Sequence, residues 1–115
     1  MVEDEAAVRA LVARVLRLHG FEVLEADGAK AAVELAAISG SPDLLVVDVV
    51  MPGTSGPELV GKLREAHPGL RVLYISGYPW DKLNETWPVS GLALLEKPFT
   101  TDRLVASVRE ALSLR

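Results

Sequence analysis

The stretch Leu44-Leu45-Val46-Val47-Asp48 is a run of four apolar residues that ends in a single carboxylate. Pro42-Asp43 lies at the start of this stretch and Pro52-Gly53 follows it, and both pairs are typical of turns. A short apolar run between turns predicts a parallel strand that is covered on both faces. Because ligands bind outside the carboxyl ends of strands in open α/β sheets, we expect Asp48 to lie where chemistry takes place.

Apolar runs alternate with amphipathic segments along the rest of the chain. Further strands are predicted at residues 21–26, 71–76 and 92–96, and helices at 5–19, 29–38, 55–67, 101–112 and, over about two turns, within 78–88. The first helix carries apolar residues at helical spacing, namely Val8, Leu11, Val12, Val15 and Leu18. Strands that alternate with helices favour βαβ units, a parallel sheet and right-handed crossovers.

Length and composition restrict the class of protein. The 115 residues are enough for one domain, so we expect residues 1–115 to form a single unit. The 12 basic residues against 16 acidic ones give a net charge of −4, which argues against direct nucleic-acid binding. The chain has no cysteine and two histidines, which excludes disulfides, thiolate catalysis and histidine-rich metal sites. With no apolar stretch of membrane length and no leader, we expect a cytoplasmic domain without membrane contact.

Five chemically active residues are predicted to meet at one edge of the sheet. Asp48, Ser76 and Lys97 each end or follow a strand, and Glu3-Asp4 follows the short apolar start of the chain. Clustered carboxylates repel one another unless a cation neutralises them, and oxygen ligands suit Mg²⁺. A lysine and a hydroxyl beside such a site favour phosphoryl transfer to an aspartate, with Asp48 as the nucleophile.

The motifs that carry these positions resemble the receiver domains of two-component response regulators, and the resemblance covers essentially the whole chain. The motifs are Val2-Glu3-Asp4-Glu5, Asp48-Val49-Val50-Met51-Pro52-Gly53, Ser76-Gly77-Tyr78 and Lys97-Pro98-Phe99. The resemblance implies a doubly wound, flavodoxin-like (βα)5 sandwich whose parallel strands follow the order 2-1-3-4-5. The sequence around Ser76 and Lys97 is most similar to that of receivers at the carboxyl end of hybrid sensor histidine kinases. A free-standing regulator is the alternative.

The resemblance also implies roles for individual residues. Asp48 would accept a phosphoryl group from the phosphohistidine of a histidine kinase or histidine phosphotransfer domain. Mg²⁺ would be held by Glu3, Asp4, Asp48 and the Val50 backbone carbonyl. Ser76 would move toward the phosphate, Lys97 would pair with it, and residues 78–99 would form the surface that switches.

Three details accompany these implied roles. The family's Lys-Pro bond is typically cis, which draws attention to Lys97-Pro98. Leu94 stands where the family often has an aromatic residue, so the usual aromatic readout is not expected. We expect Tyr78 to shape access to the phosphate instead.

The first strand is reduced to Met1-Val2. In the order 2-1-3-4-5 this strand lies inside the sheet, so its neighbours are expected to be partly unpaired. Each buried, unpaired backbone group costs about 1–3 kcal/mol. We therefore expect the domain to be destabilised, rearranged, or completed by strand exchange or homodimer formation.

Simpler interpretations and other functions compete with phosphoacceptance. Asp48 could cap a turn, the acids at positions 3 and 4 could stabilise a helix dipole, and Ser76 and Lys97 could be ordinary strand-end residues. A pseudo-receiver would use the same fold as an interaction module without phosphate. A phosphatase of the haloacid dehalogenase type needs a second Asp two residues after the first, where this chain has Val50. We expect phosphotransfer and autodephosphorylation rather than the turnover of an enzyme.

Overall fold

The computed structural model of the chain describes residues 1–77 and 93–113. Its helices are α1 (Ala6–Leu18), α2 (Ala29–Ser39), α3 (Gly56–Ala66) and α5 (Thr101–Ser113), and its strands are β1 (Leu45–Asp48), β2 (Val72–Ser76) and β3 (Ala93–Glu96). These bounds agree with the predicted ones to within one or two residues. The helix predicted within residues 78–88 lies outside the described residues.

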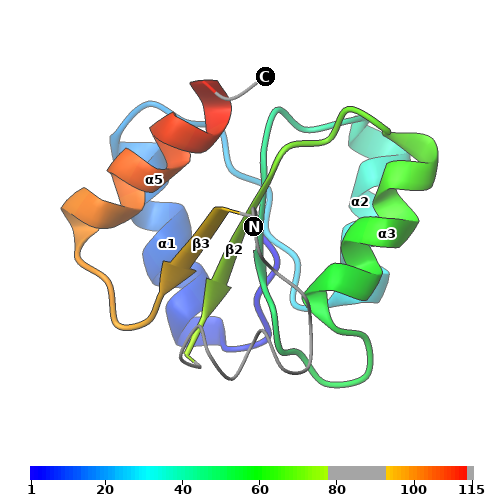
Figure 1. Cartoon of the computed structure of the whole chain (residues 1–115), viewed down its shortest axis with the longest axis horizontal. Coiled ribbons are helices and arrows are strands. Elements are labelled where there is room, and N and C mark those ends of the chain that lie inside the picture. The colour runs from blue at the N-terminus through cyan, green and yellow to red at the C-terminus, as the bar shows by residue number, and fades with distance from the viewer. Residues whose placement is uncertain (78–92, 114–115) are drawn as a thin grey trace.

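The sheet is parallel, with strands in the order β1-β2-β3. Val2 extends it beyond β1, because this residue forms parallel bridges to Val47 on one side and to Ala26 on the other. The order from Ala26 through Val2 to β3 is the predicted 2-1-3-4-5. Figure 1 shows α1 and α5 on one face of the sheet and α2 and α3 on the other. The fold is therefore the expected doubly wound sandwich.

Each face of the sheet covers its own hydrophobic core. Val47 packs with Leu59 and the apolar residues of α2 and α3, whereas Val46 packs with α1 and α5. All four residues of β1 are buried, because side chains alternate along a strand and both faces of the sheet are covered. This arrangement explains why the strand is an uninterrupted apolar run rather than an alternating one.

The strand predicted at residues 21–26 is wrong, because only Ala26 makes a strand pairing, as a single bridge. The reason is the short first strand. The Met1 amine donates to the Leu24 carbonyl (2.9 Å), Ala26 N–H donates to the Met1 carbonyl (2.9 Å), and Glu3 N–H donates to the Ala26 carbonyl (3.1 Å). Within the described residues, the hydrogen bonds between this segment and the start of the chain reach as far as Leu24.

A cavity of about 850 Å³ lies beside Met1, at the opposite end of β1 from Asp48. Its lining includes the chain on both sides of the short first strand, residues 20–24 and 42–46. The cavity is therefore flanked by the two backbone segments that Val2 joins.

The apolar face predicted for α1 is partly wrong. Val12, Val15 and Leu16 are buried, but Leu11 and Leu18 are 58% and 75% exposed. Leu11 and Leu18 are seven residues apart, so they share a helix side that points away from the sheet. No helix in the parts of the chain that the structure describes is long and apolar enough to cross a membrane.

Two helices begin with a side-chain cap. The Ser55 hydroxyl accepts a hydrogen bond from Glu58 N–H (3.3 Å) at the start of α3. The Thr100 hydroxyl accepts from Arg103 N–H (3.2 Å) at the start of α5. Such caps satisfy backbone donors that have no partner within the helix.

Candidate functional site at the carboxyl ends of the strands

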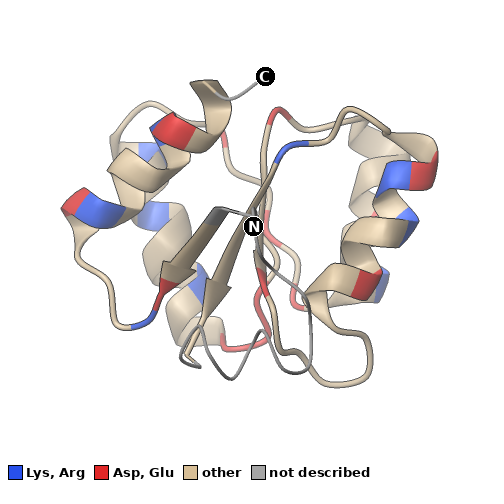
Figure 2. Cartoon of the chain, in the orientation of Figure 1, with Lys and Arg blue, Asp and Glu red and all other residues tan. Residues whose placement is uncertain are grey.

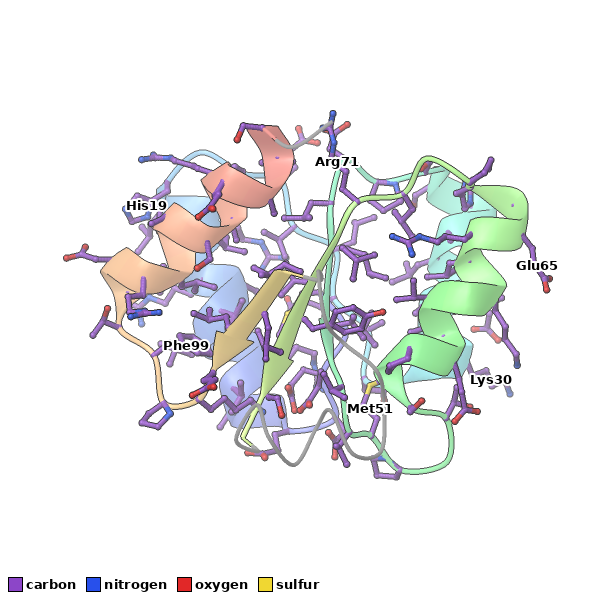
Figure 3. The ribbon with its side chains drawn as sticks, in the orientation of Figure 1. His19, Lys30, Met51, Glu65, Arg71 and Phe99 are labelled. Atoms are coloured by element: carbon purple, nitrogen blue, oxygen red, sulfur yellow. The ribbon has the colours of Figure 1, made fainter. Side chains whose placement is uncertain are left out.

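The predicted strand-end residues come together at one edge of the sheet. Asp48 is the last residue of β1, Ser76 is the last residue of β2, and Lys97 directly follows β3. The Lys97 N–H donates to the Ser76 carbonyl (2.7 Å), which ties the ends of β2 and β3 together. Figure 3 labels Met51, shortly after β1, at this end of the sheet, and Arg71, just before β2, at the other end.

Both carboxylate oxygens of Asp48 have hydrogen-bond donors. Oδ1 accepts from the Val50 N–H at 3.1 Å, and Oδ2 accepts from the Lys97 Nζ at 3.0 Å. The residue is 6% exposed. Asp48 is therefore a nearly buried carboxylate whose orientation is set by the backbone that follows it and by one lysine.

Glu3 is the most deeply buried acid of the site, with no exposed surface. Its Oε1 accepts from the Glu5 N–H (3.1 Å), and its Oε2 accepts from Lys97 Nζ (3.2 Å). Burial, and then a hydrogen bond with Asp48, raises the pKa of Glu3 from the ordinary value of 4.5 to about 7. Burial therefore disfavours the ionised form of Glu3, and a bound proton or a nearby cation offsets this cost.

Lys97 is the cation that joins the two buried acids. Burial by itself lowers the pKa of this lysine, but the hydrogen bond and charge of Asp48, together with those of Glu3, outweigh it and raise the pKa overall. The side chain keeps 20% of its surface exposed. The Lys97-Pro98 peptide bond is cis, as the resemblance implied.

Three carboxylates converge at this edge. Ligand oxygens of Glu3, Asp4 and Asp48 lie within 4.8 Å of one another, and Asp4 is exposed while the other two are buried. One ammonium against three carboxylates leaves an excess of negative charge, and an all-oxygen donor set suits a small hard cation. Figure 2 shows the acidic segment before α1 at the same end of the molecule as the carboxyl end of β3. The donor set therefore fits the expected metal.

The remaining predicted residues are placed less completely. The Val50 N–H orients Asp48, and metal binding by the Val50 carbonyl stays a prediction. Ser76 is fully buried at the strand end, and its movement toward a phosphate stays a prediction. Leu94 is half-buried against the core on the α2 and α3 side. Tyr78 and most of the predicted switching surface lie outside the described residues.

Sequence reasoning missed two residues that shape the site. Gly56 begins α3 so close to β1 that an added Cβ would overlap the Asp48 carbonyl oxygen and lie 3.0 Å from the Val49 Cα. Arg9 of α1 donates from Nη1 to the Glu3 carbonyl at 2.7 Å. A glycine at the first position of a helix was the available signal for Gly56. For Arg9 the signal was its position one helical turn after Glu5, on the side of the acids.

A model of the response regulator receiver domain matches residues 1–109, and the chain belongs to this family. It is thus a receiver domain of two-component systems, and receiver domains interact with histidine kinases or phosphotransfer proteins.

Among particular proteins, the chain is similar to the sensor kinase CckA of Brucella abortus (strain 2308), with 38% identity over 114 residues that cover 97% of this chain and 12% of the kinase. A solved receiver domain from the hybrid histidine kinase CckA shares 40% identity with a TM-score of 0.81, over 97% of this chain and 95% of that one. Sporulation initiation phosphotransferase F of Bacillus subtilis (strain 168) is 25% identical, over all of this chain and 93% of that protein. The chain thus spans a small part of some relatives and nearly all of another.

Proposed function

We propose that Asp48 is the phosphoacceptor of this receiver domain. The observation that carries the proposal is the position of Lys97 Nζ, 3.0 Å from Asp48 and 3.2 Å from Glu3, beside a third carboxylate on Asp4. A turn-capping Asp would need no half-buried lysine and no second, buried acid. A nearly buried nucleophile whose charge is balanced by a lysine is the arrangement that phosphoryl transfer to a carboxylate requires.

In the proposed reaction, one oxygen of Asp48 forms a bond to the phosphorus of a phosphohistidine. The phosphorus–nitrogen bond breaks and its electron pair returns to the imidazole, which leaves an aspartyl phosphate. Lys97 offsets the charge on the transferred group, and the Ser76 hydroxyl donates to one of its oxygens. Mg²⁺ held by Glu3, Asp4, Asp48 and the Val50 carbonyl would supply further neutralisation of that charge. Water later cleaves the acyl phosphate, so the domain resets without acting as a turnover enzyme.

The proposed partner is a histidine kinase or a histidine phosphotransfer domain, in the cytoplasm. The similarity to the CckA receiver supports a place in a hybrid kinase, with residues 1–115 as one receiver unit. A free-standing regulator is the alternative. The acidic net charge supports protein partners over nucleic acid, and homodimer formation or strand exchange stays part of the proposal.

The test is the intact mass of the protein after incubation with Mg²⁺ and a small phosphodonor. The wild type should gain one phosphate, and Asp48→Asn should gain none. Asp43→Asn is the matched control, because it makes the same change at an exposed acid near the other end of β1. It should gain phosphate like the wild type. Equal gain in Asp48→Asn would assign the phosphate to another residue.

The same experiment, together with an assay of phosphate release, separates the competing functions. A pseudo-receiver would gain no phosphate in any variant. A phosphatase of the haloacid dehalogenase type would release phosphate continuously from small phosphate esters. That chemistry needs an acid two residues after Asp48, where Val50 instead presents its N–H to the nucleophile.

A further inference from the structure

We propose that Arg9 is a positioning residue for the metal site, in that it holds the backbone of the acidic loop Glu3-Asp4-Glu5 in the conformation that binds a divalent cation. The proposal rests on the proposed function of the site. Arg9 lies on α1 and its Nη1 donates to the Glu3 carbonyl at 2.7 Å. This bond joins the helix to the residue directly before Asp4.

Arg9 and Lys97 act on the same acid in different ways. Lys97 contacts the Glu3 carboxylate and its charge affects the pKa of that group. Arg9 contacts the Glu3 backbone, and its charge is not among the causes of the pKa shift. The two cations therefore differ in role: Lys97 balances charge, whereas Arg9 fixes the chain.

The acidic loop lacks the usual means of fixing a helix start. Glu5 is the N-cap of α1 but its side chain makes no capping hydrogen bond, and the first turn of α1 contains no acid. The Glu3 carboxylate caps the helix start instead, because it accepts a hydrogen bond from the Glu5 N–H at 3.1 Å. When that carboxylate turns to a metal, the cap is weakened. The Arg9 bond to the backbone is independent of where the carboxylate points.

The backbone of Glu3 is thus held at both its N–H and its carbonyl group. Its N–H donates to the Ala26 carbonyl at 3.1 Å, and its C=O accepts from Arg9. Asp4 follows this fixed peptide and is itself exposed. Loss of the Arg9 bond would leave Asp4 free to sample positions away from Asp48. Groups that orient metal ligands in this way affect metal affinity by about 10–100-fold.

The experiment compares Arg9→Met with the matched control Arg14→Met, which changes an exposed arginine on the same helix. Mg²⁺ binding to the unphosphorylated protein is measured by isothermal titration calorimetry, and stability without metal by urea denaturation. Arg9→Met should bind Mg²⁺ at least about tenfold more weakly, and Arg14→Met should bind it like the wild type. Arg9→Lys keeps a cationic donor on the same helix position and should recover part of the affinity.

Phosphorylation by a small donor provides a second measurement. In Arg9→Met the rate should fall at limiting Mg²⁺ and return toward the wild-type value at saturating Mg²⁺. A variant that loses stability but binds Mg²⁺ like the wild type would assign Arg9 a structural role and overturn the proposal. If Arg9→Met does not fold, Arg9→Lys decides, since wild-type affinity in a less stable Arg9→Lys would likewise overturn the proposal. Failure of the wild type to bind Mg²⁺ would overturn the metal site together with the role of Arg9.

Discussion

The contribution of Glu3 to the stability of the metal-free domain should fall as the pH rises, because Glu3 is buried. The pKa of Glu3 is about 7 in the folded protein and 4.5 ordinarily. Between these values the folded protein keeps a proton that the unfolded chain has released. The contribution is therefore complete below pH 4.5 and is lost as the pH rises through 7. At 1.36 kcal/mol for each pKa unit, the loss in the free energy of unfolding is about 3 kcal/mol.

The assay is urea denaturation followed by circular dichroism, with EDTA present, at intervals from pH 4.5 to above pH 7. Glu3→Gln keeps the shape of the side chain without its titration, so the difference between wild type and variant isolates Glu3. This comparison also cancels the Met1 amine, whose pKa burial lowers to about 6 in both proteins. Glu22→Gln, at an exposed acid, is the control and should follow the wild type.

Mg²⁺ should reverse the trend, because it binds the ionised carboxylates. Its stabilising effect should therefore be larger above pH 7 than near pH 4.5. A difference between wild type and Glu3→Gln that stays constant over this range would refute the reasoning, since it would mean that the proton on Glu3 is not linked to folding.

Three further perturbations have expected outcomes. Gly56→Ala should lower the free energy of unfolding by about 2 kcal/mol in urea denaturation, because the added Cβ would overlap the Asp48 carbonyl oxygen. Gly61→Ala, in an open part of the same helix, is the control and should raise the free energy of unfolding by about 0.5–1 kcal/mol. Equal effects of the two substitutions would contradict the close contact at Gly56. Ser55→Ala should cost about 1 kcal/mol through loss of the α3 cap, and no change would show that the cap is dispensable. Adding about four apolar residues before Met1 should raise the melting temperature by about 5 °C, because they can pair with the two backbone segments that flank the cavity there. A Gly-Ser extension of the same length is the control. An equal shift in the control would rule out strand completion.

The order of the elements and the position of the site could be predicted because both depend on local patterns. The apolar run before Asp48 and the turn residues around it define a buried parallel strand, and parallel strands place their ends at one edge. Ser76 and Lys97 follow from the same rule. Hydrophobic periodicity predicted the helix bounds, although it did not tell which apolar side of α1 faces the sheet.

What could not be predicted depends on contacts between distant parts of the chain. The pairing of residues 21–26 was overestimated because the neighbouring segment pairs through Val2, and in the described residues the bridge at Ala26 is the strand pairing that forms. Gly56 and Arg9 act through the backbone carbonyls of Asp48 and Glu3, and the residue types alone do not reveal such contacts. The raised pKa of Glu3 likewise arises from burial that no local pattern reports.

The strand that carries Asp48 lies between two hydrophobic cores. Val46 packs with α1 and α5, and Val47 packs with α2 and α3. The residue at the end of this strand is therefore one or two positions along the chain from side chains that contact each helical layer. The molecule has two broad faces on which a protein could sense the same chemical event. Under the proposed function, the kinase and an output partner therefore need not compete for one surface.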